Sequence, residues 1–309
     1  MLLAALWVST SVAANEPVGW AEIVAQPSPE PGQRIAYGEA PSQFGELRLP
    51  AGEGPFPVAV LIHGGCWRVE YGLDHVAPLA ADLARHGVAV WSLEYRRLGE
   101  DGGGWPGTFD DVAAGYAQLG ELDKGLPLDL DRVVLAGHSA GGHLALWLAG
   151  REQLPAEHPW RARNAPGLRG VVALAAITDL ERYARGEGSC NRSAAALLGE
   201  SDSMRQARLP LASPARLLPP SVPVYLVHGR VDPIVPLAQS VIHAARIRAV
   251  GGAAERHIVE GAGHFDPIAP FAPAWVEARS VILRLLGVGL TGGQALLPPG
   301  SGPAMIAVQ

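Results

Sequence analysis

The chain has 309 residues, 48% of them hydrophobic, so it can bury the core of one large α/β domain or of two small ones. Its formal net charge of −6, with no run of Lys or Arg, argues against nucleic acid as a partner. The two cysteines, Cys66 and Cys190, have no Cys/His cluster around them, so we expect no structural metal. They would form one disulfide in an exported protein and remain buried thiols in a cytoplasmic one.

The first 14 residues, MLLAALWVSTSVAA, form an apolar run that ends in small residues. This ending is typical of a signal-peptidase site, so we expect a signal peptide cleaved after Ala14 and a periplasmic or secreted protein. The run is too short to span a bilayer, and no membrane span is expected. Because it lacks the basic residues that usually open a signal peptide, the alternative is a disordered N-terminus or a stray strand in a cytoplasmic protein.

Residues 15–32 are rich in proline and polar residues, and they predict an extended lead-in to a folded domain at 33–286. Within that domain, short apolar runs predict the strands. These strands cover residues 34–37, 44–49, 58–62, 88–95, 133–136, 171–175, 222–227 and 255–259. Good helix formers and helical stop signals predict the helices. These helices cover residues 77–86, a stretch from 108 onward, 144–149, 236–250 and 273–286.

Strands that alternate with helices predict an α/β fold, with a mostly parallel central sheet and helices on both of its faces. Segment 178–220 shows no clear periodicity and is predicted to be an irregular insertion between two strands. Residues 287–309 are rich in Gly and Pro and predict a disordered tail. Reactive groups in such a sheet gather at the carboxyl ends of the strands, where the motifs below are found.

The stretch Gly137-His138-Ser139-Ala140-Gly141 lies between the predicted strand at 133–136 and the helix after it. It matches G-x-S-x-G, the nucleophile elbow, a tight turn that lifts a serine hydroxyl off the end of a sheet. A side chain on either glycine would strike the neighbouring strand or helix. A chance match is the alternative in a chain with 38 glycines, but the flanking strand and helix favour Ser139 as a nucleophile.

The stretch His63-Gly64-Gly65-Cys66-Trp67 follows the predicted strand at 58–62. It resembles the HGGG-type loop of lipases and esterases, whose backbone N–H groups face an oxyanion, except that Cys66 replaces the third glycine. The backbone N–H survives that change, so we expect an oxyanion hole formed by the N–H groups of Gly65, Cys66 and Ala140. A simple turn after the strand is the alternative reading, and Ser139 is preferred to Cys66 as the nucleophile.

Two further candidates follow later strands. Asp232 could accept the Nδ1 proton of a histidine, although a helix N-cap is its alternative role and Asp179 is the alternative acid. His264 lies in a loop bounded by glycines after the final strand and could act as a general base, whereas a lone histidine in a loop is usually only solvated. The order Ser139, Asp232, His264 is the order of the α/β-hydrolase triad, which favours the catalytic reading.

These stretches together carry a family resemblance, over HGGCW, EYR, GHSAGGHLA, HGRVDPIVP and GAGHFD. The chain resembles α/β-hydrolase serine esterases, close to bacterial kynurenine formamidase-like, feruloyl-esterase-like and prolyl-oligopeptidase-related hydrolases. The resemblance covers residues 33–286. It implies the α/β-hydrolase fold, a small cap insertion at about 178–220, and a serine hydrolase that needs no cofactor.

The two cysteines lie in segments that should meet over the site, the oxyanion loop and the cap. Together with the expected export, this placement predicts a disulfide between Cys66 and Cys190. Trp67, Trp105 and Tyr183 could line an acyl or aromatic pocket, although packing in the core or at the surface is the default for each of them.

We therefore expect a serine hydrolase that cleaves a small carboxylic ester through an acyl-enzyme. An aryl formamide or a small peptide would use the same residues, so amide hydrolysis remains an alternative. A binding module without catalysis is a remote alternative from another class, because such a module would be expected to lose the nucleophile or the base. The sequence does not predict the oligomeric state.

Overall fold

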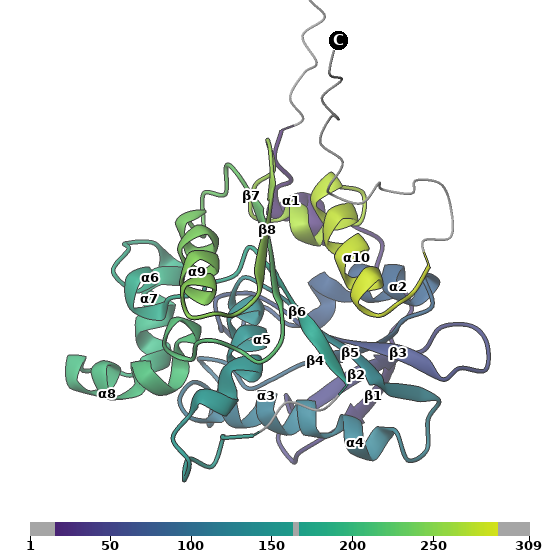
Figure 1. The fold of residues 1–309 in the computed structure, drawn as a ribbon, viewed down its shortest axis with the longest axis horizontal. Coiled ribbons are helices and arrows are strands. Elements are labelled where there is room, and N and C mark those ends of the chain that lie inside the picture. Colours follow the sequence, from purple (N-terminus) through teal and green to yellow (C-terminus); the bar gives the residue numbers. More distant parts are fainter. Residues whose placement is uncertain (1–15, 163–166, 290–309) are drawn as a thin grey trace, which may run out of the picture.

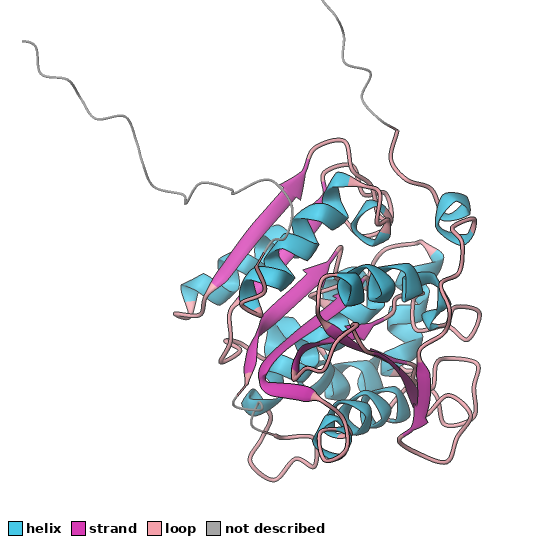
Figure 2. Cartoon of the chain, turned by 90° about the vertical axis from the view of Figure 1, so that its right-hand side faces the viewer, coloured by secondary structure: helices cyan, strands magenta, loops and turns pink. Residues whose placement is uncertain are grey.

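The computed structural model describes residues 16–162 and 167–289, so the predicted signal peptide and most of the predicted tail lie outside the described residues. One eight-stranded sheet, with helices packed on both faces, forms the described part of the chain (Figures 1 and 2). The strand order is β1-β2-β4-β3-β5-β6-β7-β8. The strands are β1 (Gln33–Ala36), β2 (Phe44–Arg48), β3 (Phe56–Ile62), β4 (Ala89–Leu93), β5 (Leu128–His138), β6 (Leu168–Leu174), β7 (Val224–Gly229) and β8 (Ala254–Val259).

Strand β2 pairs antiparallel with both β1 and β4, whereas the pairs from β4 to β8 across the sheet are parallel. The predicted mostly parallel sheet is therefore confirmed. The helices are α1 (Trp20–Val24), α2 (Ala77–Arg85), α3 (Gly107–Ala117), α4 (Leu119–Leu122), α5 (Ala140–Gly150), α6 (Leu180–Tyr183), α7 (Ser189–Leu198), α8 (Asp202–Ala212), α9 (Ala238–Ala249) and α10 (Pro273–Leu285).

Strand β3 shows how the sheet divides the core into two layers. Val58, Val60 and Ile62 pack in the cluster on the side of α3 and α5, whereas Ala59 and Leu61 face the cluster on the side of α2 and α10. All five side chains are fully buried. Successive residues of a strand point to opposite faces, so a strand covered on both sides must be apolar throughout. That requirement explains why this strand is readable as an unbroken apolar run.

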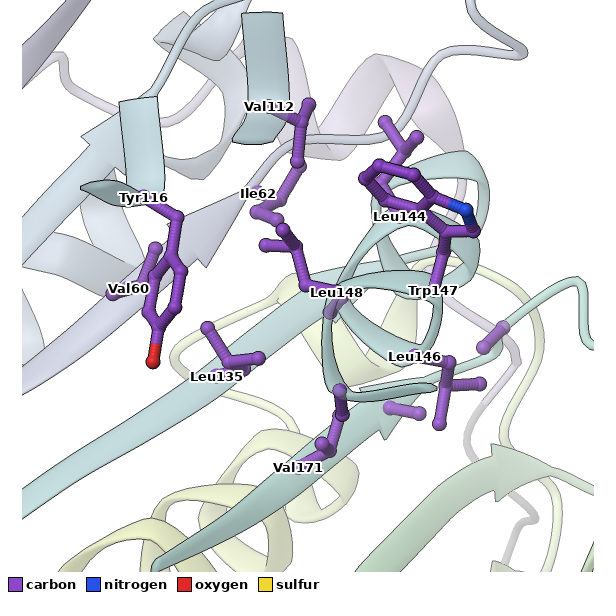
Figure 3. Close-up of a cluster of buried hydrophobic side chains, with 14 of the residues drawn as sticks. Val60, Ile62, Val112, Tyr116, Leu135, Leu144, Leu146, Trp147, Leu148 and Val171 are labelled. Carbon is purple, nitrogen blue, oxygen red and sulfur yellow. The ribbon is translucent and has the colours of Figure 1, made fainter. Parts of the chain in front are cut away.

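Helix α5 lies against the middle of the sheet and every one of its residues is buried. Leu144 and Leu148 pack toward Ile62 and Leu135 of the sheet, as Figure 3 shows. On another side of the helix, the indole N–H of Trp147 donates to the carbonyl of Leu211, at the end of α8. A helix covered on all sides is apolar around its circumference, which fits the sequence of α5.

Two local predictions are wrong. The predicted extended lead-in contains α1, and the segment predicted to be irregular contains α6, α7 and α8 (Figure 1). Helix α1 has five residues and α6 has four, which is too short for a periodic pattern. Helix α8 carries Pro210 in its last turn, a residue that predicts a break in a helix. In the described part of the chain, no helix is long and apolar enough to cross a lipid bilayer.

Candidate active site

Ser139 lies at the sharp turn between β5 and α5. Its φ of 55° and ψ of −114° place it in a region that residues other than glycine rarely adopt. The turn is held by a hydrogen bond from its backbone N–H to Leu174 and by one from His143 to its carbonyl. Only 2% of the residue is exposed. Hydrogen bonds to β6 and from α5 therefore hold Ser139 in this unfavourable backbone conformation, which is the conformation expected of a nucleophile elbow.

The two glycines of the motif allow the strand and helix to approach each other closely. A Cβ on Gly137 would overlap the carbonyl oxygen of Gly141, one turn into the helix. A Cβ on Gly141 would overlap the carbonyl oxygens of Ile62 and His63, at the end of β3. The expected steric role of both glycines is confirmed.

His264 follows β8 and hydrogen bonds to Asp232, which follows β7. The distance from Nδ1 of His264 to Oδ2 of Asp232 is 2.7 Å. The exposed fractions of the two side chains are 4% and 0%. No hydrogen bond joins His264 to the Ser139 hydroxyl within the described residues, but both residues line the same cavity. In free enzymes, catalytic hydrogen bonds of this kind are often long and tighten only when substrate binds.

Asp232 also accepts hydrogen bonds from the chain around it. Its Oδ1 accepts from the backbone N–H groups of Ile234 and Val235, each at 2.8 Å. Its Oδ2 lies 3.3 Å from Nε2 of His228, a residue to which the sequence analysis gave no role. Burial alone would raise the pKa of Asp232, but the hydrogen bonds from His228 and His264 outweigh it and hold the pKa well below its ordinary value. The carboxylate is therefore charged at neutral pH.

The alternative acid, Asp179, lies elsewhere. Its Oδ1 accepts from the backbone N–H of Arg182 and so caps α6, and its Oδ2 accepts from Arg246 at 2.8 Å. The sequence analysis preferred Asp232 and kept Asp179 as the alternative, because each of them follows a strand. In the structure, the partner of His264 is Asp232.

The loop after β3 carries two of the three residues expected to form the oxyanion hole. Gly65 has a φ of 98° and Cys66 a φ of 54°, so the chain turns sharply here. Within the described residues, the N–H groups of Gly65, Cys66 and Ala140 donate no hydrogen bond. Gly65 and Cys66 line the cavity, next to Ser139. The expected oxyanion hole therefore stays a prediction, with its three N–H groups free of other acceptors in the described part of the chain.

The side chain of His63 connects this loop to Glu94, which follows β4. Its Nδ1 lies 2.7 Å from the carbonyl oxygen of Gly64, and its Nε2 lies 2.7 Å from Oε1 of Glu94. Oε2 of Glu94 accepts from the N–H of Leu73, and the Tyr95 hydroxyl donates to the carbonyl of His63. The first residue of HGGCW and the first two of EYR thus form one buried hydrogen-bonded group. We infer that they hold the loop in place.

Electrostatics support the same arrangement. Burial would raise the pKa of Glu94, but the charge and hydrogen bond of His63, together with Arg97, hold the pKa below its ordinary value. Arg96, the third residue of EYR, forms two side-chain hydrogen bonds with Asp111 of α3, at 2.7 and 2.8 Å. Each of the three residues of EYR therefore has a structural partner: Glu94 and Tyr95 bind His63, and Arg96 binds Asp111.

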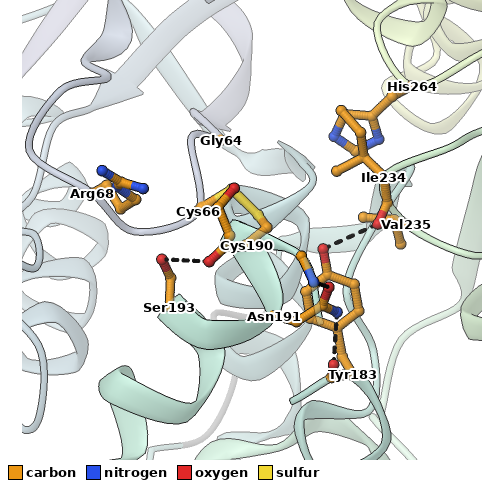
Figure 4. Close-up of a disulfide and its surroundings, with 12 residues drawn as sticks. Gly64, Cys66, Arg68, Tyr183, Cys190, Asn191, Ser193, Ile234, Val235 and His264 are labelled. Atoms are coloured by element: carbon orange, nitrogen blue, oxygen red, sulfur yellow. Dashed lines mark hydrogen bonds between the residues drawn. A yellow bond between two sulfur atoms is a disulfide. The ribbon is translucent and has the colours of Figure 1, made fainter. Parts of the chain in front are cut away.

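The predicted disulfide between Cys66 and Cys190 is confirmed (Figure 4). It joins the loop after β3 to α7, across 124 residues, with the two Cα atoms 5.1 Å apart. The same insertion is held at other points. The Tyr183 hydroxyl donates to the carbonyl of Ile234, and Nε2 of His143 lies 2.9 Å from the carbonyl of Ala212. Burial lowers the pKa of His143 to about 4, so the ring is neutral at neutral pH and can hold this position inside the protein.

A cavity of about 460 Å³ opens above Ser139. None of the described residues that line it is Asp, Glu, Lys or Arg. Tyr183 lines it, whereas Trp67 is buried in the core and Trp105 packs on Phe109 and Trp160. The lining residues are Trp20, Gly65, Cys66, Tyr71, His75, His138, Ser139, Tyr183, Gly188, Ser189, Cys190, Asn191, Pro233, Ile234, His264 and Phe265.

Two of these lining residues, His138 and Trp20, were not expected. His138 belongs to the elbow motif, and its Nε2 lies 3.0 Å from the carbonyl oxygen of His264, so it ties the elbow to the loop that follows β8. Burial, and then the neighbouring His264, hold the pKa of His138 well below its ordinary value, so the ring is neutral.

Among the described residues, no group of three or more His, Cys, Asp or Glu side chains could hold a metal ion.

The BD-FAE family matches residues 46–247 of the chain. Isoprenylcysteine alpha-carbonyl methylesterase ICME of Arabidopsis thaliana is 26% identical over 244 residues, which is 75% of this chain and 56% of that protein. Esterase LipC of Mycobacterium tuberculosis is 27% identical over 265 residues, 82% of this chain and 64% of that protein. The chain therefore spans about half to two thirds of the length of these relatives.

Solved structures share the fold. Esterase B from Lactobacillus Rhamnosis (HN001) superposes with a TM-score of 0.73 at 23% identity, covering 86% of this chain and 89% of that one. A truncated carbohydrate esterase from gut microbiota gives a TM-score of 0.69 at 19% identity, covering 84% of this chain and 97% of that one. The fold is that of the α/β-hydrolases.

Proposed function

The chain belongs to the BD-FAE family, and from this premise we propose that it hydrolyses carboxylic esters with Ser139 as the nucleophile. One observation carries the proposal: His264, which hydrogen bonds to Asp232, lines the same cavity as Ser139 and as Gly65 and Cys66, whose N–H groups donate no hydrogen bond among the described residues. The names of the relatives, among them methylesterase, acetyl-hydrolase and carboxylesterase, favour an ester over a formamide or a peptide.

In the first step, the Ser139 hydroxyl attacks the ester carbonyl while Nε2 of His264 takes its proton. Asp232 keeps the other proton on Nδ1 and stabilises the imidazolium that forms. The carbonyl oxygen becomes negatively charged and accepts hydrogen bonds from the N–H groups of Gly65, Cys66 and Ala140. Collapse of this intermediate breaks the bond to the alcohol, which leaves with the proton from His264.

In the second step, water attacks the acyl group that is now attached to Ser139. His264 takes a proton from the water, and the same three N–H groups hold the second oxyanion. When the intermediate collapses, Ser139 leaves with that proton and the carboxylic acid is released. No cofactor takes part in either step.

The residues that line the cavity favour an uncharged substrate. The described lining residues include no acidic side chain, Lys or Arg, and His138 is held neutral by burial. A charged group would lose its hydration here without gaining a partner of opposite charge. We therefore propose a small, uncharged ester as the substrate class.

The disulfide supports an oxidising compartment. Disulfides persist in secreted and periplasmic proteins and are rare in the cytoplasm of mesophiles. The bond between Cys66 and Cys190, together with the apolar N-terminal run, supports an exported protein. The predicted cleavage after Ala14 is checked by sequencing the N-terminus of the exported protein.

The decisive experiment combines a substrate panel with labelling of the serine. We expect the wild-type protein to hydrolyse short p-nitrophenyl esters faster than an aryl formamide, and to react with a fluorophosphonate probe. Ser139→Ala should abolish the labelling and lower kcat by about a millionfold, the usual cost of removing such a nucleophile.

Ser280→Ala provides a matched control, since Ser280 lies on α10 and its hydroxyl donates only to the carbonyl of Val276. This variant should keep both the labelling and the activity. Labelling that persists in Ser139→Ala would contradict the proposed nucleophile, and a formamide hydrolysed faster than every ester would contradict the proposed substrate class.

A further inference from the structure

A second cavity of about 210 Å³ adjoins the first one. Trp20, Tyr71 and His75 line both cavities, so these three side chains form the wall between them. Tyr71 and His75 follow the oxyanion loop directly in the chain. Trp20 reaches the wall from the other end of the sequence, on α1.

The segment that carries Trp20 is anchored to the loop of His264. Oδ2 of Asp266 accepts from the backbone N–H of Val18 at 3.0 Å and from that of Gly263 at 2.9 Å. The contact is close, because a Cβ on Gly263 would lie 2.8 Å from Cβ of Pro17. Val18 is buried as well. The segment is therefore a fixed part of the active-site wall.

The indole of Trp20 touches three other rings. Its centroid lies 5.5 Å from that of Tyr71, 5.4 Å from that of His75 and 5.5 Å from that of Phe265. These rings meet edge-on or tilted, which is a favourable arrangement for aromatic side chains. Phe265 is the neighbour of His264, so the indole spans from the loop after β8 to the turn that contains Tyr71.

The two cavities differ in their chemistry. The cavity at Ser139 is lined by aromatic, small and amide-bearing residues, without acidic residues among those described. The cavity behind Trp20 is lined in part by Glu70, Asp74 and Gln26. Nε2 of Gln26 is buried there and has no hydrogen-bond partner among the described residues. The cavity behind the indole thus offers space and one buried polar group without a partner, Nε2 of Gln26, among the described residues.

We propose that Trp20 is a specificity-determining residue, which limits the length of the substrate group that extends from Ser139 toward α1. With the indole in place, the group must end at the wall. Without it, the two cavities join and a longer group fits. This inference deepens the proposed function, since it assumes that the cavity at Ser139 receives the ester.

The test measures binding, so that it does not depend on turnover. Benzylacetone is the ketone in which a methylene replaces the bridging ester oxygen of benzyl acetate. Its binding to the Ser139→Ala protein is compared by calorimetry with that of two longer ketones, one extended on the acyl side and one on the alcohol side. When Trp20→Ala is added to the Ser139→Ala protein, the ketone whose extension points toward α1 should gain about tenfold in affinity relative to benzylacetone. The ketone extended on the other side should show no such gain. Ratios that stay unchanged on both sides would overturn the proposal.

Two variants serve as controls. Trp20→Phe retains an aromatic ring in the wall and should keep the ratios of the parent protein. Phe271→Ala removes an aromatic ring that is 61% exposed and does not line either cavity, so it should have no effect. If Trp20→Ala fails to fold, Trp20→Leu keeps an apolar cover over the neighbouring rings but is narrower, and it should shift the ratio in the same direction.

Kinetics with the active protein separate this inference from the proposed function. If the wild-type protein hydrolyses no ester, the proposed function fails, while the ketone ratios still decide the role of Trp20. If short esters are hydrolysed and Trp20→Ala leaves the preference between short and long esters unchanged, only the role of Trp20 is refuted.

Discussion

In the proposed mechanism, Asp232 is the side chain that orients the general base His264. It receives hydrogen bonds from two backbone N–H groups and from His264, so its orientation is fixed from several sides. Of the two roles weighed for it from the sequence, the helix N-cap is wrong, because the N-cap of α9 is Leu237. The N–H groups of Ile234 and Val235 belong to the loop before that helix and hold one carboxylate oxygen, while the other oxygen faces the imidazole of His264.

We expect Asp232→Asn to lower kcat by roughly a thousandfold to ten-thousandfold, because an amide no longer holds the proton on Nδ1 of His264. Steady-state kinetics on a p-nitrophenyl ester measures the loss. Asp179→Asn is the matched control, since Asp179 caps α6 and contacts Arg246 instead of His264. Equal losses in the two variants would contradict the assignment of Asp232.

The same substitution should alter the response to acid. The folded-state pKa of Asp232 is depressed, so its contribution to the free energy of unfolding is complete above the unfolded-state pKa, near 4, and is lost as the pH falls through the folded value. In Asp232→Asn this contribution is absent. Urea unfolding at several pH values below about 5 should therefore give a shallower acid-side slope for the variant than for the wild type. If the free energy of unfolding falls equally steeply with pH in both proteins, the proposed contribution of Asp232 to stability is contradicted.

At the scale of elements, the junction of β5 and α5 is the least tolerant point of the fold. Gly141→Ala would force the helix away from the carbonyl oxygens at the end of β3, and we expect a loss of about 3 kcal/mol or more in the free energy of unfolding. Gly120→Ala is the control, because Gly120 lies in α4 with no atom near the position of a Cβ. It should stabilise the protein by about 0.5 to 1 kcal/mol. Chemical denaturation of both variants tests the contrast.

The elements that the sequence predicted are those whose environment leaves a local pattern. The central strands are covered on both faces, and this coverage requires an apolar run such as 58–62. The loops that carry Ser139, Cys66, Asp232 and His264 follow such strands, and their residue types are set by the chemistry. The residues of the candidate site could therefore be predicted, and the preference for Asp232 over Asp179 as the partner of His264 agrees with the hydrogen bond between them.

Other elements could not be predicted because their stability comes from distant contacts. Helix α7 contains Ser189, Asn191 and Ser193, which form helices weakly on their own, but Cys190 fixes it to the loop after β3. Helix α1 is five residues long, and Ile23 is buried among side chains from elsewhere in the chain. Trp20 is held at the site by contacts with distant parts of the chain, among them the bond of the neighbouring Val18 to Asp266, 248 positions away. No local pattern of the sequence reports such contacts.

At the scale of the whole molecule, the insertion at α6 to α8 is fixed to the rest of the protein on several sides. The disulfide holds α7, Tyr183 holds the loop of Asp232, and α5 holds the end of α8. The cavity therefore has a wall with a set position. The fold therefore sets the shape of the cavity that the proposed ester would enter.

We expect the double variant Cys66→Ser/Cys190→Ser to lose about 2 to 4 kcal/mol of stability, because the bond closes a long loop in the unfolded chain. It should also lower kcat, since Cys66 supplies a proposed oxyanion donor whose position the bond fixes. Denaturation and kinetics with and without a reducing agent measure both effects. The reducing agent should affect the wild type and leave the double variant unchanged, and a wild type that is insensitive after complete reduction would contradict the coupling.

The bond between the backbone of Val18 and the carboxylate of Asp266 has a consequence for biosynthesis. A growing polypeptide emerges from its N-terminus, so the early segment must wait for almost the entire chain before it meets its partner. The cavity stays without one of its sides during that interval. Under the proposed mechanism, a chain whose last loop has not yet emerged would lack both this side of the cavity and the general base His264, so it could hydrolyse an ester only after its C-terminal part has been made and has folded back onto residues 17–20.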